Sequence, residues 1–125
     1  MSGPKKMKSR HQPGKQERYL QASLLLGLLD KASYGYELIQ NIQRYGFIEG
    51  DPPPGMVYRH LRQLEEDGLV SSRWETGGTG PAKRVYNITD DGRGVLEIWI
   101  GYMKRQSKKL NDFIGMYRKL ERQDS

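Results

Sequence analysis

Hydrophobic residues are spaced along the first half of this chain in a way that predicts three helices. Leucines occupy more than one side of a helix over residues 17–30, so this helix must be covered by more than one neighbour. Residues 33–45 place hydrophobic side chains three and four positions apart, and Gly46 is a natural helix stop. The prolines at 52–54 precede a third helix, which runs up to a left-handed cap at Gly68.

The pattern then changes to the period of two that is typical of strands. Residues 70–75 and 83–88 alternate in this way, and a glycine-rich loop at 77–81 joins them, which predicts a two-stranded hairpin. Thr89 is suited to cap a last helix over residues 89–122. The predicted fold class is therefore mainly α with a small β-hairpin (α+β), in the order of a winged helix-turn-helix followed by a long C-terminal helix.

The last predicted helix carries a hydrophobic stripe that so small a chain cannot cover along its whole length. Its members recur three and four residues apart, and all but one are hydrophobic or aromatic. They are Leu96, Trp99, Met103, Gln106, Leu110, Phe113, Tyr117 and Leu120. Such a stripe needs a partner helix, and a second copy of the chain is the simplest partner. The alternative is a stripe packed back on the first helix of the same chain.

Two arginines of the third helix are predicted to face away from the core. Val57, Leu61 and Leu64 share one side of this helix, and Arg59 and Arg62 lie on the opposite side. An α-helix fits the major groove of B-DNA, where arginine pairs bidentately with guanine. Two exposed arginines alone indicate only a solvated face, but their place in a helix–helix–helix–hairpin order favours DNA binding.

The ends of the third helix and the hairpin add further candidate contacts to DNA. Gly55 would let backbone N–H groups approach a phosphate at the positive end of the helix dipole. The hairpin tip has no bulky side chain, so it could follow the DNA backbone or the minor groove. Lys83 and Arg84 flank the tip as candidate phosphate contacts.

Length and composition narrow the class of protein. The 125 residues suit one domain, and the absence of cysteine excludes disulfides and cysteine-based metal or redox sites. The same absence fits a reducing compartment, so we expect a cytoplasmic protein. No apolar run approaches the roughly 20 residues that cross a bilayer, so we expect no membrane partner.

The positive charge is concentrated at the N-terminus. Residues 1–18 hold six basic side chains and one acidic side chain, which accounts for nearly all of the net charge of +6. The net charge of the whole chain is therefore weak evidence that the protein binds nucleic acid. Residues 1–16 lack hydrophobic periodicity and predict a disordered basic arm. The expected divisions are this arm, a winged helix DNA-binding domain at 17–88 and a C-terminal dimerisation helix at 89–122.

Catalysis has little support in this sequence. The only histidines are His11, in the arm, and His60, which is predicted to lie at the surface or to face DNA. No Ser-His-Asp set and no metal-ligand spacing is present, so we expect no enzyme, no cofactor and no metal. The alternative function is a winged-helix module that binds other proteins without specific DNA binding.

A set of short runs resembles the PadR family of transcriptional regulators. The runs are Tyr34–Leu38, Pro54–Arg59, Leu61–Glu65, Gly68–Val70 and Gly80–Tyr86, completed by Thr89, Gly92 and Leu96. The resemblance covers roughly residues 20–100, and the runs taken together are specific for the family. It implies a regulator, most simply a repressor, that binds double-stranded DNA at a palindromic operator as a homodimer and responds to a small-molecule effector.

The resemblance also assigns roles to individual positions. The implied DNA-binding residues are Gly55, Met56, Tyr58, Arg59, Arg62, Gly78, Thr79, Lys83 and Arg84. In the subfamily with one C-terminal helix, that helix packs on the first helix of the other protomer. The implied dimer interface is therefore Leu24, Leu28, Leu96, Trp99, Met103, Leu110, Phe113, Tyr117 and Leu120.

Two positions depart from the family pattern. Pro53 stands where members often have Ser or Thr, so the third helix would start elsewhere or be capped by Asp51. Met103 stands where some members have a tryptophan that stacks on flat ligands, and Trp99 lies one turn earlier. The departure counts against a pocket for flat ligands. Trp99 and Met103 are the candidate effector pocket, and the alternative is that Trp99 belongs only to the core of the dimer. The residues at 80–84 also look like those of poly-β-hydroxybutyrate-responsive repressors.

Overall fold

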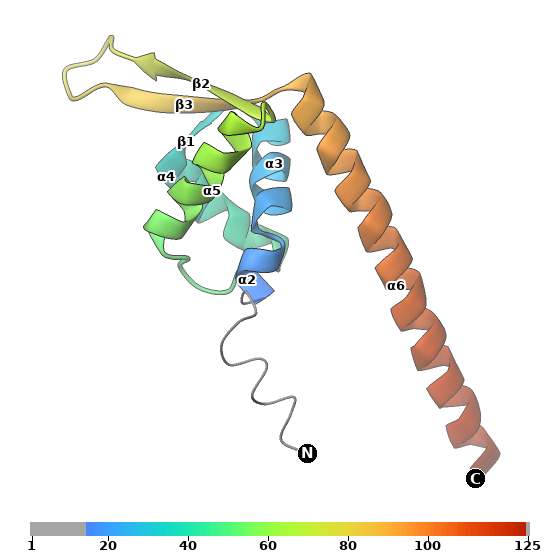
Figure 1. Ribbon diagram of the computed structural model, residues 1–125. Helices are drawn as coiled ribbons and strands as arrows, with labels where there is room; N and C mark the ends of the chain where they lie inside the picture. The colour runs from blue at the N-terminus through green and yellow to red at the C-terminus, as the bar shows by residue number, and fades with distance from the viewer. Residues whose placement is uncertain (1–14, 125) are drawn as a thin grey trace, which may run out of the picture.

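The computed structural model describes residues 15–124 (Figure 1). Its elements are α2 (Lys15–Arg18), α3 (Leu20–Asp30), β1 (Ser33–Tyr34), α4 (Gly35–Asn41), the 3-10 helix η1 (Ile42–Tyr45), α5 (Pro54–Glu66), β2 (Val70–Glu75), β3 (Lys83–Ile88) and α6 (Asp90–Asp124). The predicted order of helices and hairpin is confirmed. The predicted basic arm falls mainly outside the described residues, and helix α2 already begins at its end, at Lys15.

The small sheet has one strand more than the predicted hairpin. Strand β3 lies between β1 and β2 and pairs with both in antiparallel fashion. Ser33 pairs with Tyr86 and Tyr34 pairs with Val85, so the predicted helix start at Ser33 is wrong and α4 begins at Gly35. The Tyr34 N–H donates to the Glu37 carboxylate (2.8 Å), which caps α4 directly after the strand. Strand β1 was not predicted because a strand of two residues is too short to show an alternating pattern in the sequence.

Helix α3 forms the centre of the core. Its leucines at 20, 24 and 25 are completely buried, and Leu28 is nearly so. They pack in one cluster with Leu38 and Ile42 and with the buried face of α5. Burying each such side chain contributes about 1.5–3 kcal/mol. The prediction that this helix is covered on more than one side is confirmed.

The buried face of α5 is the predicted one. Val57, Leu61 and Leu64 are all fully buried, whereas Arg59 and Arg62 are exposed. Gly68, with a φ of 76°, ends the helix in the left-handed conformation. Helix α5 is thereby fixed against α3, and its arginine side faces solvent.

A polar joint connects the sheet to α6. The Thr89 hydroxyl accepts from the Gly92 N–H (3.0 Å), as predicted for a helix N-cap, and donates to the Gly68 carbonyl (2.7 Å). A side chain at Gly92 would collide with the Leu69 carbonyl, so the backbones approach closely here. Helix α6 leaves the core at this joint and extends beyond it (Figure 1). The whole arrangement is the predicted winged helix with a long C-terminal helix.

Candidate nucleic-acid interface

The exposed side of α5 and the wing form one continuous surface. We define the wing as β2, β3 and the loop 76–82. A hollow of about 310 Å³ is lined by Tyr58, Arg62, Glu65, Arg84 and Tyr86. An adjoining hollow of about 220 Å³ is lined by Tyr34, Gly35, Tyr36, Tyr58, Lys83, Arg84 and Tyr86. We call this shared lining the α5–wing surface. It brings together four of the predicted DNA-binding residues: Tyr58, Arg62, Lys83 and Arg84.

Arg84 holds the wing against α5. Its Nε donates to the Ser72 hydroxyl (2.9 Å), and its Nη2 pairs with the Glu65 carboxylate (3.4 Å). Ser72 in turn donates to Glu65 (2.8 Å). The guanidinium also lies over the Trp74 ring, 5.4 Å from its centre. Arg84 is therefore bound within the chain, and Glu65 is the residue of α5 that holds it.

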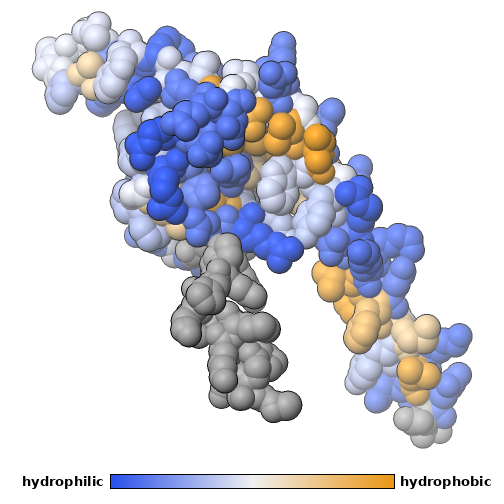
Figure 2. Space-filling model, in the orientation of Figure 1, coloured by the Kyte–Doolittle hydropathy of each residue, from blue (hydrophilic) through white to orange (hydrophobic). Residues whose placement is uncertain are grey.

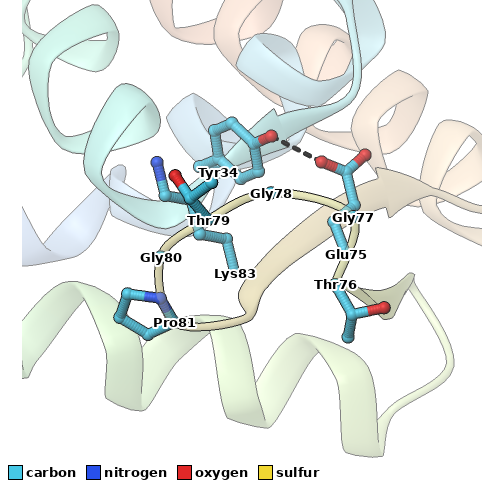
Figure 3. Close-up of a pocket in the computed structure, with 9 residues that line it drawn as sticks. All are labelled: Tyr34, Glu75, Thr76, Gly77, Gly78, Thr79, Gly80, Pro81 and Lys83. Carbon is cyan, nitrogen blue, oxygen red and sulfur yellow. Dashed lines mark hydrogen bonds between the residues drawn. The ribbon is translucent and has the colours of Figure 1, made fainter.

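Lys83 lies at the start of β3, beside the tip of the wing, and packs against two tyrosines. Its Nζ is 5.5 Å from the ring centre of Tyr34 and 5.8 Å from that of Tyr36, and the two rings are stacked nearly parallel. Tyr34 donates its hydroxyl proton to Glu75 (2.5 Å), and this bond raises the pKa of the phenol (Figure 3). The ammonium is thus held at the surface by aromatic faces.

The tip of the wing curves around a hollow of its own. Tyr34, Glu75, the loop from Thr76 to Pro81 and Lys83 line a space of about 730 Å³ (Figure 3). Gly78 and Thr79, the two predicted contacts in the tip, belong to this lining and are exposed. Neither residue lines the two hollows between α5 and the wing, although Tyr34 and Lys83 line both the tip hollow and the adjoining one.

The N-terminus of α5 starts without a side-chain cap. Pro53 occupies the cap position and Pro54 the first helical position. Asp51 accepts a hydrogen bond from Gln43 (3.1 Å) instead, so the proposed capping by Asp51 is wrong. Gly55 is exposed with open space around it, and Met56 is half-buried against the core. Pro53 and Pro54 carry no N–H, and the N–H groups of Met56 and Val57 donate to the Pro53 carbonyl (3.0 and 3.3 Å), so among these residues only the Gly55 N–H is left to approach a phosphate.

Arg59 and His60 both contact helix α2. Arg59 Nη2 donates to the Glu17 carboxylate (2.8 Å), and His60 Nε2 lies 2.9 Å from the same oxygen. The hydrogen bond from His60 is the main cause that lowers the pKa of Glu17. The Gln21 amide nitrogen lies 3.1 Å from His60 Nδ1. The prediction that His60 is at the surface or faces DNA is wrong, because its side chain is only 17% exposed and faces α2 and α3.

The predicted dimer interface divides into a buried and an exposed part. Leu24, Leu28 and Leu96 are core residues of the single chain and offer no surface to a partner, so this part of the prediction is wrong. Trp99 and Met103 are half-buried. The remaining members are 53–77% exposed: Leu110, Phe113, Tyr117 and Leu120. Figure 2 shows hydrophobic side chains gathered along this distal half of α6.

A groove runs beside Trp99, where α2 meets α6. Its volume is about 410 Å³, and its lining combines arginines with hydrophobic and aromatic side chains. The lining is Arg18, Val95, Ile98, Trp99, Tyr102 and Arg105. Trp99, one of the two predicted effector contacts, lines the groove, whereas Met103 does not. Within the described part of the chain, no group of three or more acidic, histidine or cysteine side chains could hold a metal. Over the same residues, no helix is both long and hydrophobic enough for a bilayer.

Sequence reasoning missed the acidic partners of the interface. Glu17, Glu65 and Glu75 each bind a residue on another element, at separations of 43, 19 and 41 positions along the chain. The spacing of neighbouring residues in the sequence cannot indicate pairs between residues so far apart along the chain. Tyr36 lies in the run Tyr34–Leu38, but only the folded chain places it beside Lys83.

The comparisons with known proteins agree on one family. The model of the transcriptional regulator PadR-like family matches residues 25–98. A probable transcriptional regulator of Mycobacterium tuberculosis, Rv1176c, is 33% identical over 78 residues, which are 62% of this chain and 41% of that protein. The matched region thus spans well under half of that relative, and the rest of its length has no counterpart in the alignment.

Solved structures show the same architecture. A PadR family regulator from Clostridium difficile is 27% identical, with a TM-score of 0.66 over 77% of this chain and 98% of that chain. Bacillus subtilis PadR in complex with operator DNA shares the fold with a TM-score of 0.57 at 23% identity, over 65% of this chain and 46% of that chain. The narrower likeness to poly-β-hydroxybutyrate-responsive repressors stays a prediction. The family model and the fold together show that this chain belongs to the PadR-like family of transcriptional regulators.

Proposed function

We propose that this chain binds duplex DNA through the α5–wing surface and represses transcription by occupying its operator. The observation that carries the proposal is the convergence of Arg62, Lys83 and Arg84 on adjoining hollows between one exposed helix face and the wing. A helix in the major groove and a wing on the neighbouring backbone are a common combination of base and phosphate contacts.

Arg62 is the side chain best placed to read bases. It is exposed and makes no hydrogen bond or ion pair with the described part of the chain. Arg59 and Arg84, by contrast, are already bound to carboxylates. A free guanidinium loses no internal partner when it pairs with guanine, so Arg62 contributes its full bidentate bond. The remaining proposed DNA contacts are Gly55, Met56, Tyr58, Arg59, Gly78 and Thr79.

We propose that two copies bind a palindromic site together. The exposed distal stripe of α6 supplies the contact, with Trp99 and Met103 at its edge. Its hydrophobic side chains are Leu110, Phe113, Ile114, Met116, Tyr117 and Leu120. The ion pair between Lys108 and Asp112 (2.8 Å) lies on the opposite side of α6, so the side of the helix away from the stripe is polar. A twofold pair would present two α5 helices to successive turns of one DNA face.

The groove beside Trp99 is the proposed effector site. Its lining joins an indole, a phenol and aliphatic side chains with the guanidinium groups of Arg18 and Arg105. It touches α2 and α6 at once, so an occupant would change how these two helices meet. Such a change would alter the spacing of the two α5 helices in the dimer.

Salt-dependent DNA binding tests the proposed function. The full chain is titrated with the duplex upstream of its own gene and with a shuffled duplex, at several salt concentrations. The logarithm of the binding constant should fall linearly with the logarithm of salt. Arg62→Ala should weaken binding to the upstream duplex by 1–3 kcal/mol, about 5- to 150-fold, and reduce the preference over the shuffled duplex. Arg44→Ala removes the same charge beside α3, at a separate hollow, and should change the preference little.

Two results would count against this function. Equal loss of preference in Arg62→Ala and Arg44→Ala would show that α5 does not read bases. Absence of any complex with DNA at physiological salt would favour a winged helix that binds other proteins.

A further inference from the structure

One carboxylate oxygen joins the N-terminal helix to α5. Glu17 Oε2 accepts from Arg59 Nη2 at 2.8 Å and lies 2.9 Å from His60 Nε2. The Glu17 side chain is 28% exposed and that of Arg59 is 59% exposed. Arg59 is therefore not a free cation on the outer face of α5, because a partner on another helix determines where its guanidinium lies.

The position of Glu17 is itself fixed from two directions. On the core side, His60 is held between Glu17 and Gln21, with each ring nitrogen within 3.1 Å of a polar partner. The bond from His60 keeps the pKa of Glu17 below its usual value, so the carboxylate is charged at neutral pH.

On the other side, the residues that follow Glu17 are bound to α6. The Arg18 guanidinium donates to the Tyr102 hydroxyl (2.8 Å). The Tyr19 ring stacks on Phe47, with 4.3 Å between centres, and meets the edge of Trp99. Three consecutive residues thus contact α5, α6 and Phe47, and these contacts hold Glu17 in place.

We propose that Glu17 is a positioning residue for DNA recognition, which fixes the guanidinium of Arg59 so that this side chain discriminates between sequences. The inference rests on the proposed function and deepens it. A guanidinium has five N–H donors, and the bond to Glu17 engages Nη2. The rest of the group is presented in one orientation, which favours a bond of defined geometry over a diffuse attraction to phosphate.

The negative charge of Glu17 beside Arg59 predicts the direction in which DNA affinity changes when that charge is removed. A carboxylate at contact distance cancels much of the attraction of Arg59 for the phosphate backbone, which is the sequence-independent part of affinity. Removal of the Glu17 charge would release a long, mobile cation. Binding to any duplex should then become tighter and more salt-dependent, while the preference for the correct sequence declines.

Glu17→Gln in two backgrounds tests the proposal. Affinities for the upstream duplex and for a shuffled duplex are measured over a salt series, in the native chain and in Arg59→Ala. In the native background, Glu17→Gln should tighten binding to the shuffled duplex, steepen the salt slope by about one and lower the preference up to about fivefold. In the Arg59→Ala background these effects should disappear. Thermal unfolding of each variant checks that the fold persists.

Two matched variants separate positioning from simple charge removal. Glu66→Gln removes one negative charge from the exposed side of α5 itself, so its effect should be the same with and without Arg59. Glu17→Asp keeps the carboxylate and should retain the native salt slope.

The outcomes distinguish this proposal from the proposed function. Additive effects of Glu17→Gln and Arg59→Ala, or a Glu17→Gln variant that behaves like Glu66→Gln, would overturn the positioning role in a protein that binds DNA. Failure of the native chain to bind either duplex would overturn the proposed function and this inference together.

Discussion

At the scale of single residues, each cation at the α5–wing surface has a different environment. Arg84 is bound to Glu65, Lys83 lies over two tyrosine rings, and Arg62 is exposed without such a partner in the described chain. The helical period predicts which residues face outward, because orientation on a helix depends only on spacing. It cannot predict what they meet, because the partners come from other elements. For this reason the outward position of Arg62 was predictable, whereas the internal bonds of Arg84 were not.

Gly35 shows how a residue without a side chain shapes this surface. A Cβ at position 35 would overlap the Tyr58 ring, which covers the start of α4. Tyr58 is 38% exposed and can rotate away. Gly35→Ala should therefore fold, since alanine favours the helix by about 1 kcal/mol, but should displace the Tyr58 ring and weaken DNA binding several-fold.

Binding titrations and thermal unfolding check this prediction. In a Tyr58→Ala background, Gly35→Ala should no longer change DNA affinity, because no ring remains to be displaced. Gly94→Ala, a substitution into open space on α6, is the control for helix propensity. A Gly35→Ala protein that binds as tightly as the native chain would contradict the role given to Tyr58.

At the scale of elements, the long helices and the hairpin follow from the sequence pattern, and the short strand does not. Helix α5 ends as its glycine predicts, and β2 and β3 have the expected bounds. Strand β1 forms because β3 offers it a free edge, and β3 lies some 50 residues later in the chain. A strand of two residues has no period of its own, so it depends wholly on this tertiary partner.

The joint at Thr89 sets the direction in which α6 leaves the core. Its hydroxyl accepts from Gly92 and donates to Gly68, so it binds the end of α5 and the start of α6 together. Thr89→Ala should lower the free energy of unfolding by about 1 kcal/mol, the usual cost of a lost N-cap. Denaturant unfolding measures the change. Thr89→Ser keeps the hydroxyl and should lose much less, and an equal loss in both variants would assign the effect to the methyl group.

At the scale of the whole molecule, α6 has a part that is buried against the core and a part that is exposed. Its first turns pack on the core of the same chain through Leu96, so the alternative in which the stripe packs back on its own chain holds for this part. The distal part remains uncovered, and Phe113 is 77% exposed. A helix of 35 residues is about 50 Å long at 1.5 Å per residue, so α6 extends past the core of the domain. The resemblance to the subfamily led to Leu24 and Leu28 as interface residues, and burial in the chain's own core corrects this.

A single charge in the distal stripe should separate the two copies of the proposed dimer. Leu110→Asp places a carboxylate where the proposed interface is hydrophobic, so the variant should be monomeric while its core remains folded. Sedimentation velocity measures the change in mass. Asn111→Asp introduces the same charge at the next position, pointing away from the stripe, and should leave the dimer intact. A Leu110→Asp variant that sediments like the native chain would place the dimer contact elsewhere.

In the mode of binding that we propose, two joined copies present two α5 helices to one duplex. The most direct measurement is a footprint of the native chain and of Leu110→Asp on the DNA upstream of its own gene. The native chain should protect two related half-sites about one helical turn apart, and Leu110→Asp should protect neither at the same concentration. One protected half-site, or equal protection by both proteins, would show that the chain does not bind DNA as a pair joined through α6.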